Sequence, residues 1–247
     1  MRSKVFFIFI ILVISLSGQK VNSDLIYLVN QPTQKTAKVP VLIMLHGYGS
    51  NEEDLFEISK ALDPRLITFS LRGPIAKGQG TYCWYELSRD SEGNFVYDYK
   101  QAQASKTKIL SFISQACKVY KLDSTQVFLI GFSQGAIMSY EIAASAPTKV
   151  KGILALSGRL MEETKQLKTD WTKVAELKYF IAHGYSDNMI KISEAEKAVS
   201  FFKEKKAVDV TYKAYEMPHT ISGAELNDIK EWLVKALKPK SAAPTSK

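Results

Sequence analysis

The sequence predicts an α/β protein with a mostly parallel central sheet, helices on both faces of the sheet and no large cap domain. Apolar runs with the composition of strands alternate with helix-like segments along the chain, which is typical of parallel sheets. The run 41–45 is apolar at every position, as expected of a strand that is covered on both faces. A glycine-bracketed turn at 131–135 joins one such strand to a helix. The 247 residues, 46% of them hydrophobic, are enough for one domain with one core.

The start of the chain has the pattern of an export signal. Arg2 and Lys4 precede the apolar run 5–16, which is too short to span a bilayer comfortably but suits the core of a signal peptide. Small residues allow cleavage after Ser17 or after Ser23. We therefore expect export to a periplasm or out of the cell, with an uncleaved membrane anchor as the alternative. The expected division is a signal peptide over 1–23, a folded domain over 24–238 and a disordered tail over 239–247.

The charge of the chain gives no sign of a nucleic-acid partner. The formal net charge is +8, and cleavage after Ser23 would leave 30 basic and 25 acidic residues, or +5. The lysines are scattered, and no basic stripe with interleaved aromatic residues is present. We expect no nucleic acid partner and no stable membrane insertion after signal cleavage. The oligomeric state stays open.

Seven strands and several helices are expected in order along the domain. The strands are 24–29 at an edge, 41–45, 66–71, 127–130, 150–156, 178–182 and 208–215. Helices are expected at 98–120, 136–144 and 193–206, and two more should begin at capping boxes, Ser50 to Glu53 and Ser222 to Glu225. The glycine-rich stretch 73–94 predicts a loop, and the polar stretch 159–177 predicts a surface excursion rather than a lid.

The turn Gly131-Phe132-Ser133-Gln134-Gly135 carries the first sign of chemistry. A strand followed by G-x-S-x-G and a helix is the nucleophile elbow of the α/β-hydrolase fold. The turn is so tight that Ser133 should be strained with its Oγ exposed, and side chains at the two glycines would collide with the strand and the helix. Ser133 is therefore the candidate nucleophile. An inert serine in a glycine-bracketed turn is the alternative.

A nucleophilic serine needs a basic histidine, and the histidine needs an orienting acid. In this fold the chain order is serine, acid, histidine. His219 follows the last predicted strand and is the candidate base, whereas His46 and His183 each end an earlier strand. Asp187 follows the strand 178–182 and is the candidate acid. Two less suitable acids are Asp170, in the polar excursion, and Asp209, at the start of a strand.

Backbone donors and an apolar wall complete the predicted site. The N–H of Gln134 should form one half of an oxyanion hole, and the N–H of Tyr48 in the glycine-containing loop 46–50 should form the other. We expect His46 to hold this loop in place rather than to take part in chemistry. Trp84 and Tyr85, with Tyr82 nearby, should form a shallow apolar wall for the substrate.

The two cysteines, Cys83 and Cys117, lack the spacing of metal ligands. Export would permit a disulfide between them, but pairing cannot be read from the sequence. We expect no metal and no cofactor.

Five motifs together give the chain a resemblance to a known family. They are Leu45-His46-Gly47-Tyr48-Gly49, Gly131-Phe132-Ser133-Gln134-Gly135, Leu156-Ser157-Gly158, His183-Gly184 with Asp187-Asn188-Met189-Ile190, and His219. On these motifs, residues 25–238 resemble the phospholipase/carboxylesterase family, which includes acyl-protein thioesterases and small bacterial esterases. The resemblance implies a compact serine hydrolase without a cofactor that acts on carboxylic esters, thioesters or lysophospholipids.

One departure from the family pattern bears on the substrate. The eukaryotic thioesterases commonly carry an aspartate directly after the second glycine of the 46–50 loop, where this chain has Ser50. This favours the bacterial esterase-like subgroup over protein depalmitoylation. We expect esters of short to medium acyl chains, because the stretch 159–177 is too polar and too short for a hydrophobic lid and the 73–94 stretch offers only a shallow apolar wall. Two alternatives are a secreted peptidase, for which a propeller or large cap is lacking, and a catalytically inactive hydrolase used as a binding protein.

Overall fold

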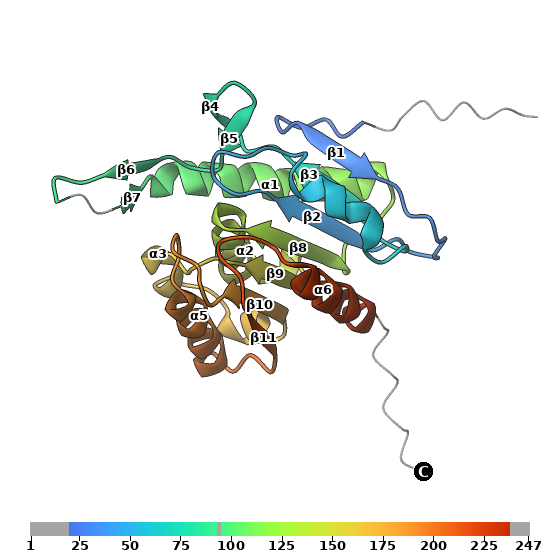
Figure 1. The fold of residues 1–247 in the computed structure, drawn as a ribbon. Coiled ribbons are helices and arrows are strands. Elements are labelled where there is room, and N and C mark those ends of the chain that lie inside the picture. Colours follow the sequence, from blue (N-terminus) through green and yellow to red (C-terminus); the bar gives the residue numbers. More distant parts are fainter. Residues whose placement is uncertain (1–19, 93–94, 238–247) are drawn as a thin grey trace, which may run out of the picture.

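A seven-stranded sheet forms the centre of the molecule. The computed structural model describes residues 20–92 and 95–237, and the strand order is β1-β3-β2-β8-β9-β10-β11 (Figure 1). The strands are β1 (Tyr27–Asn30), β2 (Val41–Leu45), β3 (Ile67–Leu71), β8 (Val127–Phe132), β9 (Gly152–Leu156), β10 (Lys178–Gly184) and β11 (Asp209–Tyr215). β1 runs antiparallel to β3, and the remaining neighbours are parallel. The α/β-hydrolase sheet predicted from the sequence is therefore confirmed, with β1 at an edge.

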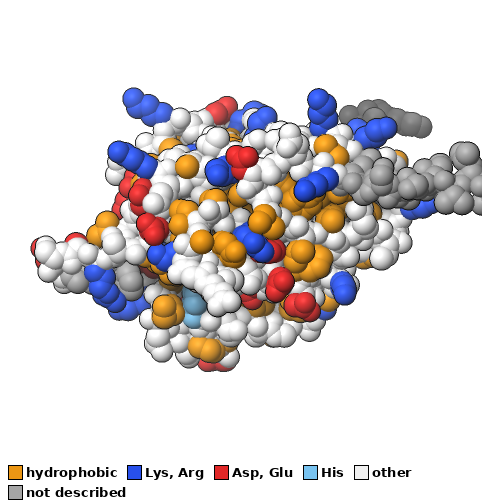
Figure 2. Space-filling view, turned by 90° about the horizontal axis from the view of Figure 1, so that it is seen from above, with side chains coloured by type: hydrophobic (Ala, Val, Ile, Leu, Met, Phe, Trp, Pro, Cys, Tyr) orange, Lys and Arg blue, Asp and Glu red, His pale blue; other side chains and the backbone are white. Residues whose placement is uncertain are grey.

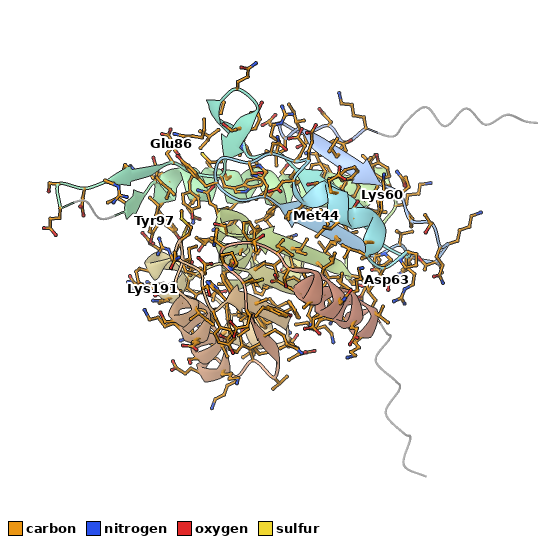
Figure 3. All side chains as sticks on the ribbon, in the orientation of Figure 1. Met44, Lys60, Asp63, Glu86, Tyr97 and Lys191 are labelled. Carbon is orange, nitrogen blue, oxygen red and sulfur yellow. The ribbon has the colours of Figure 1, made fainter. Side chains whose placement is uncertain are left out.

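Helices cover both faces of this sheet, so the protein has two cores. One face packs against α1 (Tyr99–Val119), α2 (Gln134–Ser145) and α5 (Ile192–Glu204), and the other packs against the short 3-10 helix η1 (Leu55–Ala61) and α6 (Gly223–Ala236). Successive side chains of β2 point to opposite faces of the sheet, so Ile43 packs in the first core and Met44 in the second. Side chains fill both layers between the sheet and the helices (Figure 3). Burial on both faces is why the 41–45 run is apolar throughout.

The first of the two expected capping boxes is wrong. The hydroxyl of Ser50 donates to Asp54 Oδ2 at 2.8 Å instead of capping a helix. The N–H of Glu53, the other member of the expected box, donates to Asn51 Oδ1 at 2.9 Å and not to Ser50. The neighbouring Glu52 carboxylate pairs with Arg72, whose Nε donates to Oε2 at 2.6 Å. As a result only η1, a 3-10 helix, follows this segment.

The second expected capping box forms only in part. Ser222 caps α6 by accepting a hydrogen bond from Glu225 N at 3.1 Å. Burial raises the pKa of the Glu225 carboxyl and the nearby Ser222 N–H partly offsets this, but neither oxygen forms a well-aligned hydrogen bond, so the second half of the box is weak.

The stretch 73–94 is not a simple loop. It contains the hairpin β4 (Ile75–Gly78) with β5 (Thr81–Cys83), and strand β6 (Leu87–Arg89), which pairs with β7 (Phe95–Tyr97). The β6–β7 hairpin projects from the body of the molecule (Figure 1). A bridge between Ser50 and Tyr82 attaches the first hairpin to the loop after β2. Composition did not predict these strands, because β4 (Ile-Ala-Lys-Gly) and β6 (Leu-Ser-Arg) contain few strand-favouring residues and form by pairing with β5 and β7.

The stretch 159–177 is a compact surface excursion, as expected. It forms two short helices, α3 (Glu162–Lys165) and α4 (Trp171–Ala175), and a single 3-10 turn η2 (Pro147–Lys149) precedes it in the chain. Trp171 packs edge-on against Phe201 of α5, with ring centroids 5.5 Å apart. Thr164 of α3 donates to the buried Glu141 carboxylate of α2 at 2.5 Å, and Lys106 of α1 pairs with the same carboxylate at 3.0 Å. These contacts hold the excursion against the body.

The described residues test only part of what the sequence predicts for the two ends of the chain. Most of the predicted signal, 1–19, and the predicted tail, 239–247, lie outside the described residues. Val21 is 1% exposed and belongs to the core, so ordered packing begins before the expected domain start at Asp24. In the described part of the chain, no helix has the length and apolarity to cross a membrane. Basic and acidic side chains are interspersed on the face shown in Figure 2.

The two cysteines are both free and buried, so the disulfide that the sequence left open is not formed. Burial raises the pKa of the Cys83 thiol to about 11.

Candidate active site

Ser133 sits at the point where β8 turns into α2. Its backbone has φ of 53° and ψ of −113°, a conformation that non-glycine residues rarely adopt. A Cβ atom at Gly135 would lie 1.9 Å from the carbonyl oxygen of Leu45, and one at Gly131 would lie 2.2 Å from the carbonyl oxygen of Gly135. The two glycines therefore allow the sharp turn by removing backbone collisions. The turn has the geometry of a nucleophile elbow, with the serine half-buried at its tip.

Asp187 and His219 meet at the carboxyl end of the sheet. His219 Nδ1 lies 2.6 Å from Asp187 Oδ2, and Asp187 Oδ1 accepts hydrogen bonds from the N–H groups of Met189 and Ile190, both at 2.9 Å. Burial alone would raise the pKa of Asp187, but the hydrogen bonds from His219 and from Ile190 N hold this pKa below its usual value. Asp187 is therefore ionised and fully bonded.

A close backbone approach brings these two loops together. A Cβ at Gly184 would lie 2.2 Å from the carbonyl oxygen of Met217, so only glycine allows the end of β10 to pass so near the loop after β11. Ser186 N then donates to Met217 O at 3.2 Å. In the sequence, the glycine of the His183-Gly184 pair marks the position of this close approach.

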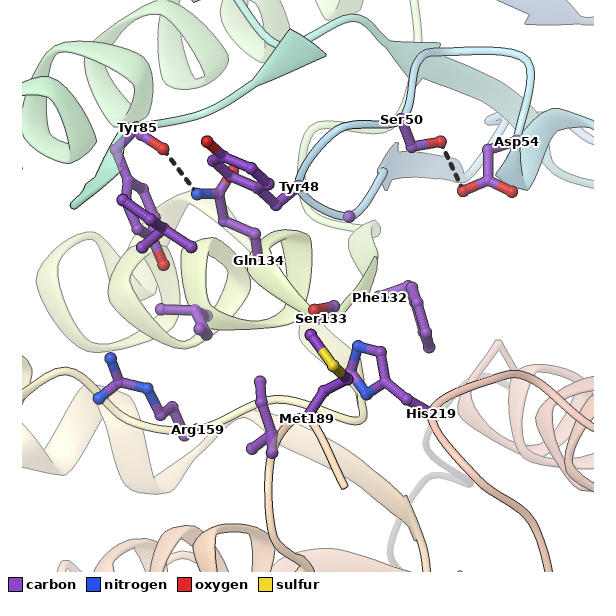
Figure 4. Close-up of a pocket in the computed structure, with 14 residues that line it drawn as sticks. Tyr48, Ser50, Asp54, Tyr85, Phe132, Ser133, Gln134, Arg159, Met189 and His219 are labelled. Atoms are coloured by element: carbon purple, nitrogen blue, oxygen red, sulfur yellow. Dashed lines mark hydrogen bonds between the residues drawn. The ribbon is translucent and has the colours of Figure 1, made fainter. Parts of the chain in front are cut away.

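Ser133 and His219 line the same pocket (Figure 4). The ring of Phe132 lies 4.8 Å from the His219 ring, centroid to centroid, and supports its orientation.

The two alternative candidate acids have other roles. Asp170 caps α4 by accepting from Thr172 N at 3.0 Å, and Asp209 pairs with Lys178 at 2.9 Å. The structure thus brings together Ser133, Asp187 and His219.

His46 holds the loop after β2, as expected. Its Nδ1 donates to Gly47 O at 2.7 Å, and its Nε2 accepts from Gly73 N at 2.9 Å. Burial lowers the pKa of His46, which keeps the ring neutral as this double bonding requires.

His183 contributes to the position of Asp187, a role that the sequence did not predict. Its Nε2 lies 2.7 Å from Ile190 O and 3.1 Å from Asp187 Oδ2. Since a carbonyl can only accept, Nε2 carries the proton and is shared between the two oxygens. The fully buried His183 therefore supports the Asp187 loop from behind.

The two predicted oxyanion donors lie at the pocket. Tyr48 and Gln134 both line it. Gln134 is the first residue of α2, so its N–H has no acceptor within the helix. The Gln134 side chain is locked from the other side: its Oε1 accepts from Trp84 N at 2.8 Å, and its Nε2 donates to Tyr85 O at 2.7 Å. These bonds fix the start of α2 relative to the aromatic segment.

The predicted aromatic wall is wrong for two of its three members. Trp84 is fully buried, and its Nε1 donates to His46 O at 2.9 Å, so it supports the loop after β2 from behind. Tyr82 stacks on the Arg72 guanidinium, whose central carbon lies 4.5 Å from the ring centroid. Tyr85 does line the pocket. Composition alone showed the aromatic residues of this segment but not the direction in which each one points.

The pocket has a volume of about 470 Å³, within the range of small-molecule sites. Its apolar lining comes mostly from residues for which the sequence predicted no contact with substrate. These are Leu87, Ile137, Met189 and Ile190, with Arg159 and Asp54 as charged members. The positions of two of them could have indicated that they line the pocket. Ile137 lies one helical turn after Ser133, and Met189 lies two residues after Asp187.

Fold and site together define a serine hydrolase of the α/β-hydrolase fold. Comparison with known proteins adds the family. The model of the phospholipase/carboxylesterase family matches residues 27–237, so the chain belongs to that family. The resemblance inferred from the motifs is confirmed.

Individual relatives agree with this assignment. Acyl-protein thioesterase 1 of Kluyveromyces lactis is 30% identical over 217 residues, covering 80% of this chain and 92% of the relative. The hydrolase MhqD of Bacillus subtilis is 27% identical over 200 residues, covering 80% and 94%. The crystal structure of the Bacillus cereus carboxylesterase superposes with a TM-score of 0.74 at 25% identity, covering 87% of this chain and 96% of that one.

Proposed function

We propose that the protein is an exported serine carboxylesterase that cleaves esters of short to medium acyl chains. The observation that carries the proposal is the 2.6 Å contact between His219 and Asp187 at the pocket that Ser133 also lines. This arrangement supplies a nucleophile, a base and an orienting acid in the order typical of the fold.

The proposed reaction passes through an acyl-enzyme. His219 Nε2 accepts the proton of Ser133 Oγ as that oxygen attacks the ester carbonyl. The N–H groups of Gln134 and Tyr48 stabilise the oxyanion, and the resulting imidazolium is stabilised by Asp187. His219 then gives the proton to the leaving oxygen. Water repeats the sequence and releases the acid.

The shape of the pocket supports small substrates. Tyr85, Ile137 and Ile190 give it apolar walls, and its volume is about 470 Å³. The short helices α3 and α4 lie against the body rather than forming a large lid. A thioester or a lysophospholipid would use the same chemistry, and relatives named acyl-protein thioesterase make thioesters the first alternative to test.

Export is part of the proposal, and the structure bears on where the signal would be cut. Val21 is buried in the core, and its N–H donates to the Tyr27 hydroxyl at 2.9 Å. Cleavage after Ser17 would keep these contacts, whereas cleavage after Ser23 would remove them. We therefore favour a mature protein that begins at Gly18. Intact-mass measurement of the exported protein tests this, and a mass that retains residues 5–16 would mean a membrane-anchored form.

Labelling with a fluorophosphonate probe tests the catalytic proposal most directly. Wild-type protein should be labelled and should hydrolyse p-nitrophenyl butyrate, whereas Ser133→Ala should do neither. Absence of labelling in folded wild-type protein would favour the inactive binding protein. Cleavage of peptides in preference to esters would favour the peptidase.

A further inference from the structure

A cation lies in the wall of the pocket and has no part in the chemistry proposed above. Arg159 follows β9 by three residues, and β9 pairs with β8 in the register Phe132 to Leu156. At Gly158 the chain passes so close to α2 that a Cβ there would lie 2.5 Å from Ala136 Cβ. This close approach carries Arg159 along the first turn of α2 and into the wall of the pocket.

The Arg159 guanidinium is held in place by an aromatic ring, and the carboxylates near it are bonded to other groups. Its central carbon lies 5.2 Å from the centroid of the Tyr97 ring, which positions it by a cation–π contact. The two carboxylates of α3 have other partners: Glu162 pairs with Lys165 at 2.7 Å, and Glu163 accepts from the Tyr97 hydroxyl at 2.5 Å. Within residues 20–92 and 95–237, no carboxylate forms an ion pair with Arg159.

The arrangement around Ser133 decides which part of a substrate meets this cation. His219 must protonate the leaving oxygen, so the leaving group lies on its side of Ser133. Figure 4 shows Tyr85 and Arg159 on the opposite side of Ser133 from His219. The acyl chain therefore extends toward Arg159.

The opposite end of the pocket carries the opposite charge. Asp54 lines that end together with Ser50, whose hydroxyl donates to it at 2.8 Å (Figure 4). An anionic alcohol would meet this carboxylate, whereas an anionic acyl group would meet Arg159. The polarity of the pocket thus favours negative charge on the acyl side only.

We propose that Arg159 binds a carboxylate at the far end of the acyl chain, so that the preferred substrates are half-esters of dicarboxylic acids. The apolar side chains of Tyr85 and Ile137 contact the methylene groups between the two carboxyl ends. A guanidinium pairs with a carboxylate through two parallel hydrogen bonds, which gives both affinity and direction. This inference rests on the proposed function, because it concerns the substrate of the same site.

The test compares esters that differ only in the terminal charge. Phenyl hydrogen adipate and phenyl hexanoate have acyl chains of equal length, and 4-carboxyphenyl hexanoate moves the charge to the leaving group. For wild-type protein, kcat/KM should be higher for the adipate half-ester than for the hexanoate. Arg159→Gln should lower the adipate-to-hexanoate ratio at least tenfold and leave the hexanoate rate within about threefold. Added salt should reduce the wild-type preference.

A matched control removes a cation elsewhere. Lys235→Gln on α6 changes an exposed side chain and should leave the ratio unchanged. An unchanged ratio in Arg159→Gln, an equal loss on both acyl chains, or a selective loss on 4-carboxyphenyl hexanoate would each overturn the inference.

Binding separates this inference from the proposed reaction. In a Ser133→Ala background, calorimetry with phenyl hydrogen adipate should show binding that Arg159→Gln weakens at least tenfold. If wild-type protein hydrolyses none of the esters, the proposed function fails, and this binding difference still decides the role of Arg159. Equal binding with and without Arg159 would reject that role.

Discussion

His219 Nδ1 lies 2.6 Å from Asp187 Oδ2, and the same oxygen is 3.1 Å from His183 Nε2. With Asp187 Oδ1 taken by two backbone N–H groups, the carboxylate cannot rotate. It can accept from His219 only in the tautomer that carries a proton on Nδ1. This leaves Nε2 of His219 free of a proton and able to act as base toward Ser133.

Asp187→Asn should lower kcat by about 10³–10⁴ with little effect on folding. An amide at this position can donate to Nδ1 and so stabilises the wrong imidazole tautomer. Steady-state hydrolysis of p-nitrophenyl butyrate measures the effect. Asp209→Asn is the matched control, since Asp209 pairs with Lys178 away from the pocket. A larger loss in Asp209→Asn or in Asp170→Asn would show that the acid is misassigned.

Ser133→Ala and His219→Ala should each lower kcat by about 10⁴–10⁶, and the double variant should be little worse than either. The two residues act as one unit, so their losses do not add. The residual rate comes from the oxyanion donors. Activity near that of the wild type in Ser133→Ala, or additive losses in the double variant, would contradict the assignment.

His183 should act through the position of Asp187. Removing its Nε2 donor in His183→Ala leaves Ile190 O without its partner and loosens the turn that holds Asp187. We expect kcat to fall by about tenfold with KM nearly unchanged, because the loss affects orientation of the base. His183→Gln retains a donor and should recover part of the rate. A KM effect without a kcat effect would place His183 in substrate binding instead.

Much of the fold could be predicted because its signals are local. The all-apolar 41–45 run indicates a strand that is covered on both faces. The two glycines of G-x-S-x-G indicate a turn so tight that any Cβ atom there would collide with neighbouring backbone. The triad order then selected His219 and Asp187 from a small set of candidates. Each of these inferences needed only neighbouring residues and the connectivity of the fold.

The failures depend on side-chain partners that the local sequence pattern does not specify. Ser50 and Glu53 could have formed a capping box, but Ser50 Oγ donates to Asp54 and Glu53 N donates to Asn51. Trp84 turns inward because His46 O accepts its indole N–H across 38 positions. His183 looked like a strand end, yet its contact with Asp187 depends on the fold of the following turn. The sequence pattern shows which side chains are present, whereas the hydrogen bonds of the folded chain decide where they point.

Glu225 should make stability depend on pH. Burial raises the pKa of this carboxyl from 4.5 to about 8, and the nearby Ser222 N–H offsets only a small part of that effect because it forms no well-aligned hydrogen bond. The folded protein therefore keeps a proton that the unfolded chain has lost, so the contribution of Glu225 to stability falls as pH rises from about 4.5 to 8. The maximum slope is about 1.4 kcal/mol per pH unit.

Urea unfolding at pH 5, 6.5 and 8 measures this slope. Glu225→Gln should flatten it, and Glu231→Gln, an exposed carboxylate on the same helix, should leave it unchanged. A slope equal to that of the wild type in Glu225→Gln would show that another group titrates.

The acyl-length profile should have a maximum at short to medium chains for neutral esters. Each methylene buried in the pocket contributes about 0.8 kcal/mol, so kcat/KM should rise only while apolar wall remains for the chain to contact. The apolar wall consists of Tyr85, Leu87, Ile137, Met189 and Ile190 in a pocket of about 470 Å³, and the polar 159–177 excursion adds no hydrophobic cover. A series of p-nitrophenyl esters from acetate to palmitate measures the profile, and detergent or lipid should give no activation because no lid has to open. A rate that rises steadily to palmitate, or that jumps above the micelle threshold, would show that long lipids are the better substrates.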